Sequence, residues 1–152
     1  MFTALHWRLL HRRFCYDGRV NAAPIGAVLD DVARVAAREE GLSLLVLFGS
    51  RARGDETPRS DWDFGYLGDQ AFDADSLLAA LVIRLGTDRV DLTDLGRAGA
   101  LLRHRAAADS RVVYAANERI FPLFWLEAVS FWCDVEPVLR RGYRAVLSEL
   151  GP

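Results

Sequence analysis

The sequence predicts an α/β domain in which a mixed sheet of few strands is flanked by helices and followed by a long C-terminal helical region. Three observations support this fold class. Short apolar segments alternate with segments of helical period along most of the chain. The chain has 152 residues, 51% of them hydrophobic, which suits one ordered globular domain. Beyond about residue 117 the pattern is helical and rich in aromatic residues.

The first half of the domain is expected to contain one helix and two strands. Apolar residues recur with helical spacing over residues 25–40, and Gly41 is the expected helix stop. Residues 42–48 form an apolar run that predicts a buried strand. Residues 54–59 are polar and predict a loop, after which residues 61–67 form the second strand.

The second half is expected to alternate helix and strand. Residues 73–85 predict a helix whose acidic first turn suits the helix dipole. Residues 89–95 predict a third strand, and residues 111–115 a short fourth one. Between these strands, residues 95–108 are expected to be helical, with Asp94 as a candidate N-cap.

Residues 117–150 predict a long helical region, with Pro122 in its first turn and Pro137 bending or splitting it. Its apolar residues form a stripe wider than one helix face: Ile120, Phe121, Leu123, Phe124, Trp125, Leu126, Ala128, Phe131, Trp132, Val135, Val138 and Leu139. A helix that is apolar on more than one side must bury both sides. The sheet would cover one side, and a second protein chain is expected to cover the other. The alternative is a fully internal helix.

Residues 1–19 are predicted to be an N-terminal extension, so that the domain itself spans residues 20–152. The segment is basic and aromatic without a clean period, and it lacks the continuous apolar stretch of a signal peptide. Two explanations stay open: an upstream extension from a start codon assigned too early, or a short helix packed on the surface.

Composition excludes several classes of function. The net charge of −2 and the pI near 5.9 argue against direct nucleic-acid binding. No apolar run approaches the length of a membrane span. Cys15 and Cys133 show no metal-ligand spacing, which predicts free thiols in a reducing cytoplasm. Every basic residue is arginine, so a catalytic lysine is excluded.

The most informative motif is Gly49-Ser50, followed ten residues later by Asp61-x-Asp63. Side chains alternate across a strand, so the two aspartates point to one face of the sheet. Two carboxylates on one face repel unless a cation lies between them, and oxygen ligands suit Mg²⁺. If Ser50 opens a helix, the free N–H groups of its first turn can bind phosphate. A phosphate site beside paired carboxylates predicts metal-assisted nucleotidyl transfer.

Gly-Ser, about ten residues and Asp-x-Asp together resemble the motif of the nucleotidyltransferase superfamily, which implies the polymerase beta-like nucleotidyltransferase fold. The length and the aromatic tail narrow the resemblance, over residues 22–150, to the minimal nucleotidyltransferases of bacteria and archaea. These proteins are antitoxins of type VII toxin–antitoxin systems. They transfer AMP from ATP to a tyrosine of a HEPN-domain ribonuclease toxin and so silence it.

The resemblance implies the roles of individual residues. Gly49 and Ser50 would bind the triphosphate of ATP, with Arg51 and Arg53 as candidate phosphate ligands; the alternative for both arginines is a solvated helix face. Asp61 and Asp63 would hold two Mg²⁺ ions about 3.5–4 Å apart.

A third carboxylate usually completes such a site: it joins one of the metal ions as a ligand and helps to deprotonate the attacking hydroxyl. Asp91 is favoured over Asp94, because it alternates with apolar Val90 and Leu92 in mid-strand, whereas Asp94 lies at the strand end. Gly65 is expected to leave room for substrate on the same strand face.

The resemblance therefore implies a protein adenylyltransferase of the cytoplasm that forms a hetero-oligomer with a HEPN toxin, and the apolar stripe predicts that the C-terminal helical region forms the interface. Two alternatives remain: a nucleotidyltransferase acting on small molecules, such as aminoglycosides, and an antitoxin that neutralises its toxin by binding alone.

Overall fold

The computed structural model describes residues 25–149. The predicted extension, residues 1–19, and the start of the domain at residue 20 lie outside this range. None of the helices between residues 25 and 149 is both long enough and apolar enough to cross a membrane.

A four-stranded mixed sheet forms the centre of the fold. Its strands are β1 (Leu42–Phe48), β2 (Trp62–Gly68), β3 (Val90–Asp94) and β4 (Arg111–Ala115). They are arranged in the order β3-β2-β1-β4, with β1 antiparallel to β2 and to β4, and β2 parallel to β3. The predicted mixed sheet of few strands is confirmed.

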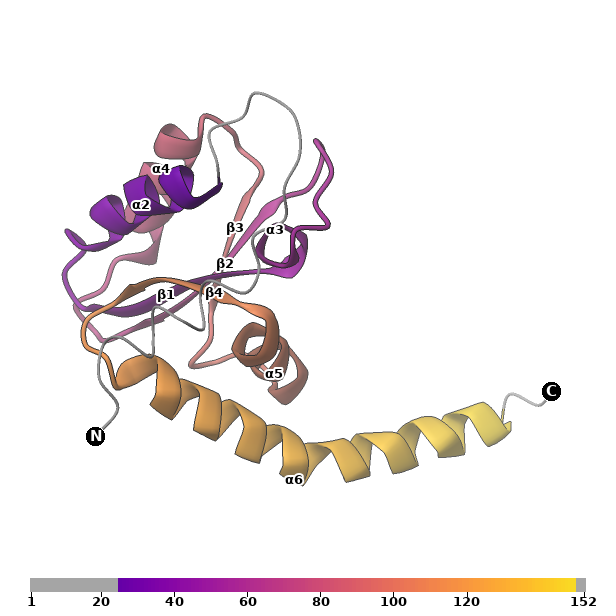
Figure 1. Ribbon diagram of the computed structural model, residues 1–152. Helices are drawn as coiled ribbons and strands as arrows, with labels where there is room; N and C mark the ends of the chain where they lie inside the picture. Colours follow the sequence, from indigo (N-terminus) through magenta and orange to yellow (C-terminus); the bar gives the residue numbers. More distant parts are fainter. Residues whose placement is uncertain (1–24, 150–152) are drawn as a thin grey trace.

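Helices cover both faces of this sheet. Figure 1 shows α2 (Ile25–Ala36) and α4 (Ala74–Leu85) on one face, and α5 (Ala100–Asp109) and α6 (Ile120–Glu149) on the other. A short helix, α3 (Gly49–Arg53), follows directly from the end of β1. The parallel pair β2 and β3 is connected through α4, as parallel pairing requires a crossover.

The core has two parts because β1 is buried on both of its faces. Leu45 and Leu47 pack with Phe64 into the layer beneath α2 and α4. Leu44 and Val46 alternate with them and contribute to the layer beneath α5 and α6. A strand between two helical layers is expected to be apolar on both faces, which explains the continuous apolar run at residues 44–48.

The predicted helix at residues 73–85 is confirmed, with its ends fixed by local chemistry. Asp73 is its N-cap, and the side-chain carboxylate accepts hydrogen bonds from the backbone N–H groups of Asp75 and Ser76. Gly86 ends the helix in the left-handed conformation, with φ of 66°.

The predicted start of the next helix was wrong. Helix α5 begins at Ala100, with Gly99 as its N-cap, and not at residue 95. The backbone N–H of Leu95 donates to the Tyr66 carbonyl at 2.9 Å, and the Leu95 side chain is fully buried. Because these contacts hold Leu95 against β2, the chain cannot turn into a helix there. The Asp94 carboxylate instead accepts from the N–H groups of Gly96 and Arg97, closing a turn.

Helix α6 is continuous through Pro137 and is curved rather than split (Figure 1). Phe124 and Ala128 are buried against the sheet and α5. On other sides of the same helix segment, Leu123 and Leu126 are exposed. Trp125 is also exposed, whereas Trp132 is half-buried and stacks on His104 of α5 at 5.2 Å. The described chain therefore buries one side of α6 and leaves apolar residues on the other, as the sequence predicted.

Candidate active site

The Gly-Ser turn packs directly against one of the predicted catalytic carboxylates. The chain leaves β1 at Phe48, turns at Gly49 with φ of +75°, and enters α3. A Cβ atom on Gly49 would overlap the carboxylate of Asp63, which lies opposite Phe48 in the β1–β2 register. Glycine is thus required twice here, by the left-handed backbone and by the close approach of Asp63.

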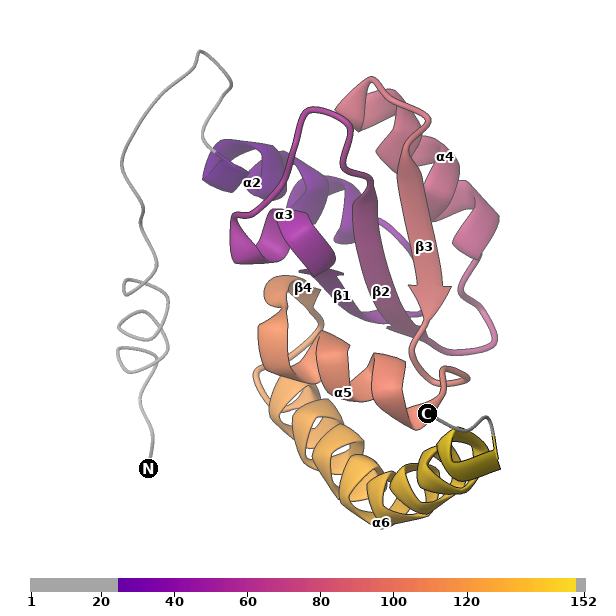
Figure 2. The same cartoon turned by 90° about the vertical axis from the view of Figure 1, so that its right-hand side faces the viewer.

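Three aspartates lie together beside this turn. Asp61 immediately precedes β2, and Asp63 is the second residue of that strand. The parallel register of β2 and β3 pairs Asp63 with Asp91. Neighbouring strands are about 4.8 Å apart, so this pairing places Asp91 next to Asp63. Asp63 is half-buried, whereas Asp61 and Asp91 are exposed. The end of α3 and the first residues of β2 and β3 are seen together in Figure 2.

The site favours binding of positive charge. Burial raises the pKa of Asp63, and the neighbouring carboxylates of Asp91 and Asp61 raise it further. The guanidinium groups of Arg51 and Arg53 act in the opposite direction. Because like charges crowd this carboxylate, a cation between the aspartates would stabilise their ionised forms.

The donor set suits Mg²⁺ in its chemistry, since all the candidate ligands are carboxylate oxygens. Within residues 25–149, no three acidic, histidine or cysteine side chains converge closely enough to hold a metal ion by themselves. Magnesium in nucleotide sites is ordinarily held by one or two carboxylates together with substrate phosphates. Asp61 and Asp63 therefore fit such an ion when a triphosphate supplies the remaining ligands.

Asp94, the alternative third carboxylate, lies away from Asp63. It pairs with Tyr66 in the β2–β3 register, at the far end of β3. Its carboxylate closes the turn after β3 and forms an ion pair with Arg97 at 3.6 Å. It also raises the pKa of the Tyr66 hydroxyl, although burial is the larger cause. Of the two candidates, Asp91 is the one beside Asp63; its catalytic role stays a prediction.

Arg51 positions Asp61 in a way that the sequence did not reveal. Its guanidinium donates to the backbone carbonyls of Ser60, at 2.6 and 3.2 Å, and of Asp61, at 3.1 Å. It also stacks over the Trp62 ring at 4.3 Å. Arg51 thereby fastens the end of the loop to α3. A role in phosphate binding remains a prediction for this residue.

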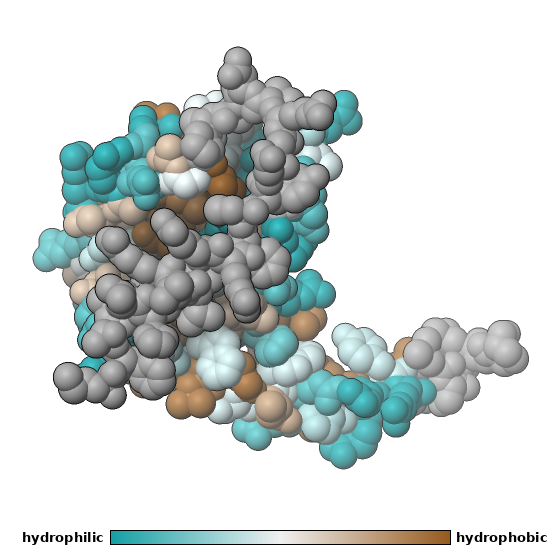
Figure 3. Space-filling model, viewed as in Figure 1, coloured by the Kyte–Doolittle hydropathy of each residue, from teal (hydrophilic) through white to brown (hydrophobic). Residues whose placement is uncertain are grey.

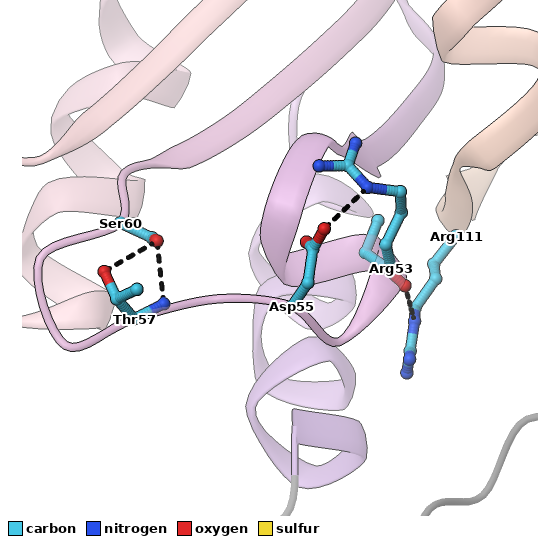
Figure 4. Close-up of polar contacts among 6 residues, drawn as sticks. Arg53, Asp55, Thr57, Ser60 and Arg111 are labelled. Carbon is cyan, nitrogen blue, oxygen red and sulfur yellow. Dashed lines mark hydrogen bonds and ion pairs between the residues drawn. The ribbon is translucent and has the colours of Figure 1, made fainter.

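Arg53 and Arg111 complete the surroundings of α3 (Figure 4). Arg53 pairs with Asp55 at 3.2 Å on the exposed side of the helix. Arg111 reaches from β4 and donates to the Ala52 carbonyl at 2.8 Å, at the C-terminal end of α3. The same figure shows Thr57 and Ser60 joined by hydrogen bonds within the loop. Arg111 was missed from the sequence because its contact spans 59 residues and follows no local pattern.

An open hollow of about 360 Å³ adjoins the carboxylates. It is lined by Asp61, Asp88, Arg89, Val90 and Asp91. Arg89 closes one side by donating to the Arg59 carbonyl at 2.8 Å. Two of the three aspartates thus face a space that is open to solvent and available to a substrate.

The expectation for Gly65 was wrong. A Cβ atom at this position would lie 2.8–2.9 Å from the side-chain carbons of Leu95. The space beside Gly65 is therefore filled by the protein core rather than left for substrate.

This contact gives a testable expectation. Gly65→Ala should lower the free energy of unfolding by roughly 1–3 kcal/mol, because the added methyl overpacks a filled site. Denaturant unfolding measures the change. The double variant Gly65→Ala/Leu95→Val should recover part of the loss. Equal stability of the single variant and the wild type would contradict the packing described.

Comparison with known proteins places the chain in a family. Residues 30–119, more than half of the chain, match the model of the polymerase beta nucleotidyltransferase domain. The chain therefore belongs to the polymerase beta nucleotidyltransferase family. The matched range includes all four strands and all the site residues discussed above.

The chain is also similar to a named protein. The chain is 36% identical over 85 residues to the protein adenylyltransferase MntA of Aphanizomenon flos-aquae. That alignment covers 48% of this chain and 57% of the relative.

Solved structures show the same fold. The chain resembles a toxin–antitoxin structure with AMP-PNP at 22% identity and a TM-score of 0.60, covering 83% of this chain and 98% of the other. It also resembles a chain in the structure of a tri-AMPylated Shewanella oneidensis HEPN toxin in complex with MNT antitoxin. In that case the identity is 19%, the TM-score is 0.60, and the coverage is 84% of this chain and 98% of the other.

Proposed function

We propose that this chain is a magnesium-dependent protein adenylyltransferase that transfers AMP from ATP to a tyrosine of a HEPN-class toxin and acts as its antitoxin in the cytoplasm. One observation carries the proposal: Asp63 packs against the Gly49 turn and pairs in register with Asp91. These contacts bring the candidate phosphate-binding turn together with two of the three candidate carboxylates. Similarity to MntA, a named protein adenylyltransferase, supports protein as the acceptor class.

The turn and α3 would bind the nucleotide. The first N–H groups of α3 lack partners within the helix, and the Ser50 hydroxyl adds a further donor. These groups would orient the triphosphate and neutralise charge on the departing pyrophosphate. Asp61 and Asp63 would hold Mg²⁺, which when bound would withdraw charge from the phosphate oxygens.

Asp91 would activate the acceptor. Its exposed carboxylate would take the proton from the tyrosine hydroxyl as the phenolic oxygen bonds to the α-phosphorus of ATP. The bond from the α-phosphorus to the oxygen bridging the β-phosphate breaks, and pyrophosphate leaves. The hollow beside Asp61 and Asp91 gives the acceptor side chain a path to this position.

Co-expression with the protein encoded by the neighbouring gene tests the proposal. Intact mass spectrometry of that partner should show the addition of one or more adenylyl groups, and peptide mapping should locate them on tyrosine. Toxicity of the partner should fall in parallel. A neutralised but unmodified partner would instead establish an antitoxin that works by binding alone. Transfer to an aminoglycoside without any change in the partner would establish the small-molecule enzyme.

A further inference from the structure

The apolar seam of α6 continues beyond the part of the helix that packs against the sheet and α5. Its members follow the 4-3-4-3-4 spacing of a coiled-coil seam: Ala128, Trp132, Val135, Leu139, Gly142 and Val146. The first two members pack on the domain, Ala128 within the core and Trp132 against His104. Leu139 and Val146 are 38% and 54% exposed. We call residues 137–149 the arm.

The arm projects away from the sheet, in Figure 1 toward the edge of the molecule where α3 lies, and Figure 2 shows α5 between α3 and α6. Figure 3 shows an open notch between the arm and the rest of the domain, with hydrophilic residues along the opposite side of the arm. Pro137 follows Val135 by two residues, or about 200° around the helix, so its ring faces away from the seam. The seam is therefore unobstructed along the arm.

Within residues 25–149, neither the backbone conformation nor the packing requires glycine at position 142. It lies inside α6, away from both ends, and its φ is not in the left-handed region. A Cβ atom there would meet nothing within 4 Å. Glycine destabilises a helix interior relative to alanine, so the isolated chain is less stable with Gly142 than it would be with alanine at this position. Close approach of a second helix to the seam would explain why no side chain is present.

The charges of the arm indicate what kind of helix would approach. Residues 137–144 contain three arginines and no acidic residue. Arg140 is paired with Glu136, whereas Arg141 and Arg144 are exposed and form no ion pair with any residue between 25 and 149. A partner helix with acidic residues beside its own apolar seam would complement them.

We propose that the arm docks an amphipathic helix of the partner protein, with acidic residues on the flanks of that helix, into the notch on the side of α3. The interface is a short two-helix seam in which the partner backbone passes close to Gly142. The proposal rests on the proposed function for the identity of the partner. Beyond that function, it names the surface that would hold the acceptor protein on the same side of the molecule as the proposed nucleotide-binding turn.

Two variants at one position test the seam with the full chain and the co-expressed neighbouring gene product. Gly142→Leu and Gly142→Ala should both keep or raise the melting temperature of the isolated chain, since both residues favour helix. Gly142→Leu should weaken the complex at least tenfold in Kd by filling the space at the seam, while Gly142→Ala should weaken it much less. Unchanged affinity of Gly142→Leu would overturn the proposal.

Charge reversal gives an independent test. Arg141→Glu/Arg144→Glu should weaken the complex and reduce its dependence on salt, because complementary charges are lost. Arg38→Glu/Arg119→Glu, which reverses two exposed charges outside the arm, is the matched control and should leave affinity unchanged. Equal effects of the two reversals would count against an acidic partner helix.

Self-association would also overturn the proposal. If the wild-type chain alone forms a dimer and the Gly142→Leu variant is a monomer, a second copy of the chain occupies the arm.

Failure of the docking proposal can be distinguished from failure of the proposed function. The Asp61→Asn/Asp63→Asn variant should bind the partner with wild-type affinity but not modify it. Arm variants should bind poorly and regain modification as concentration rises. Binding through the arm without adenylyl transfer would refute only the enzymatic function, and transfer that is insensitive to the arm would refute only the docking surface.

Discussion

An Asp61→Asn/Asp63→Asn double variant is expected to lose adenylyl transfer completely while keeping its fold. Asparagine matches aspartate in shape but removes the charges that would hold Mg²⁺. Neither residue contributes to the apolar core, so circular dichroism and the cooperativity of unfolding should be unchanged. Transfer is measured by the intact mass of the partner.

A matched control distinguishes loss of the site from general loss of acidic charge. Asp69→Asn/Asp73→Asn also removes two carboxylates, but these lie between β2 and α4, away from the site. This control should keep full transfer, even if weaker capping of α4 lowers stability slightly. Retained transfer in the Asp61/Asp63 variant would show that the carboxylates have been assigned the wrong role.

Because the pKa of Asp63 is raised, we expect the stability of the metal-free protein to unfolding to depend on pH. The folded state holds the proton of this carboxyl more tightly than the unfolded state, whose pKa is close to 3.8. The contribution of Asp63 to stability is therefore greatest at low pH and falls as pH rises from about 3.8 through the raised value. Asp63→Asn should remove this contribution. Unfolding midpoints at several pH values, with chelator present, check the sign.

Gly49→Ala is expected to damage both stability and transfer. The added methyl would overlap the Asp63 carboxylate, and the residue would be held at a positive φ that alanine disfavours. The combined cost is roughly 2–4 kcal/mol of unfolding free energy. Displacing Asp63 by even about 1 Å should reduce transfer on the order of 100-fold.

Gly54→Ala is the matched control for this prediction. Gly54 also has a positive φ, of 83°, but a Cβ atom there would meet nothing within 4 Å. It should cost about 1–2 kcal/mol through backbone strain alone and leave transfer near the wild-type rate. If both variants lost transfer to the same degree, strain in α3 rather than displacement of Asp63 would be the cause.

The parts of the fold that could be predicted from the sequence are those that depend on short-range patterns. The buried strand at residues 42–48 follows from a run that is apolar at every position except Ser43, and the helix at residues 73–85 has an acidic start and Gly86 after its end. The expectation that Asp61 and Asp63 point to one face rests on the two-residue period of a strand, and in the structure Asp61 immediately precedes β2. None of these inferences requires knowing which strands are neighbours.

What could not be predicted depends on contacts between distant segments. Leu95 fills the space at Gly65 and keeps α5 from starting early, but nothing near residue 95 indicates that β2 lies beside it. Arg51 looks like a phosphate ligand by position, yet its guanidinium is bonded to carbonyls nine and ten residues away. The preference for Asp91 over Asp94 comes from the alternation of Asp91 with Val90 and Leu92 in the sequence. Its position beside Asp63 depends on the β2–β3 register, which strand propensity alone does not determine.

The pairing of Asp63 with Asp91 across two parallel strands also couples ligand occupancy to backbone dynamics. Their separation is fixed by the hydrogen-bonded ladder, so mutual repulsion acts directly on the pairing of β2 with the edge strand β3. A cation that screens this repulsion should make opening of the pair rarer. Amide hydrogen exchange in β2 and β3 should then slow on loading with nucleotide and metal, while exchange in β4 changes little. The edge of the sheet would thus report on whether the site is filled, without any assay of catalysis.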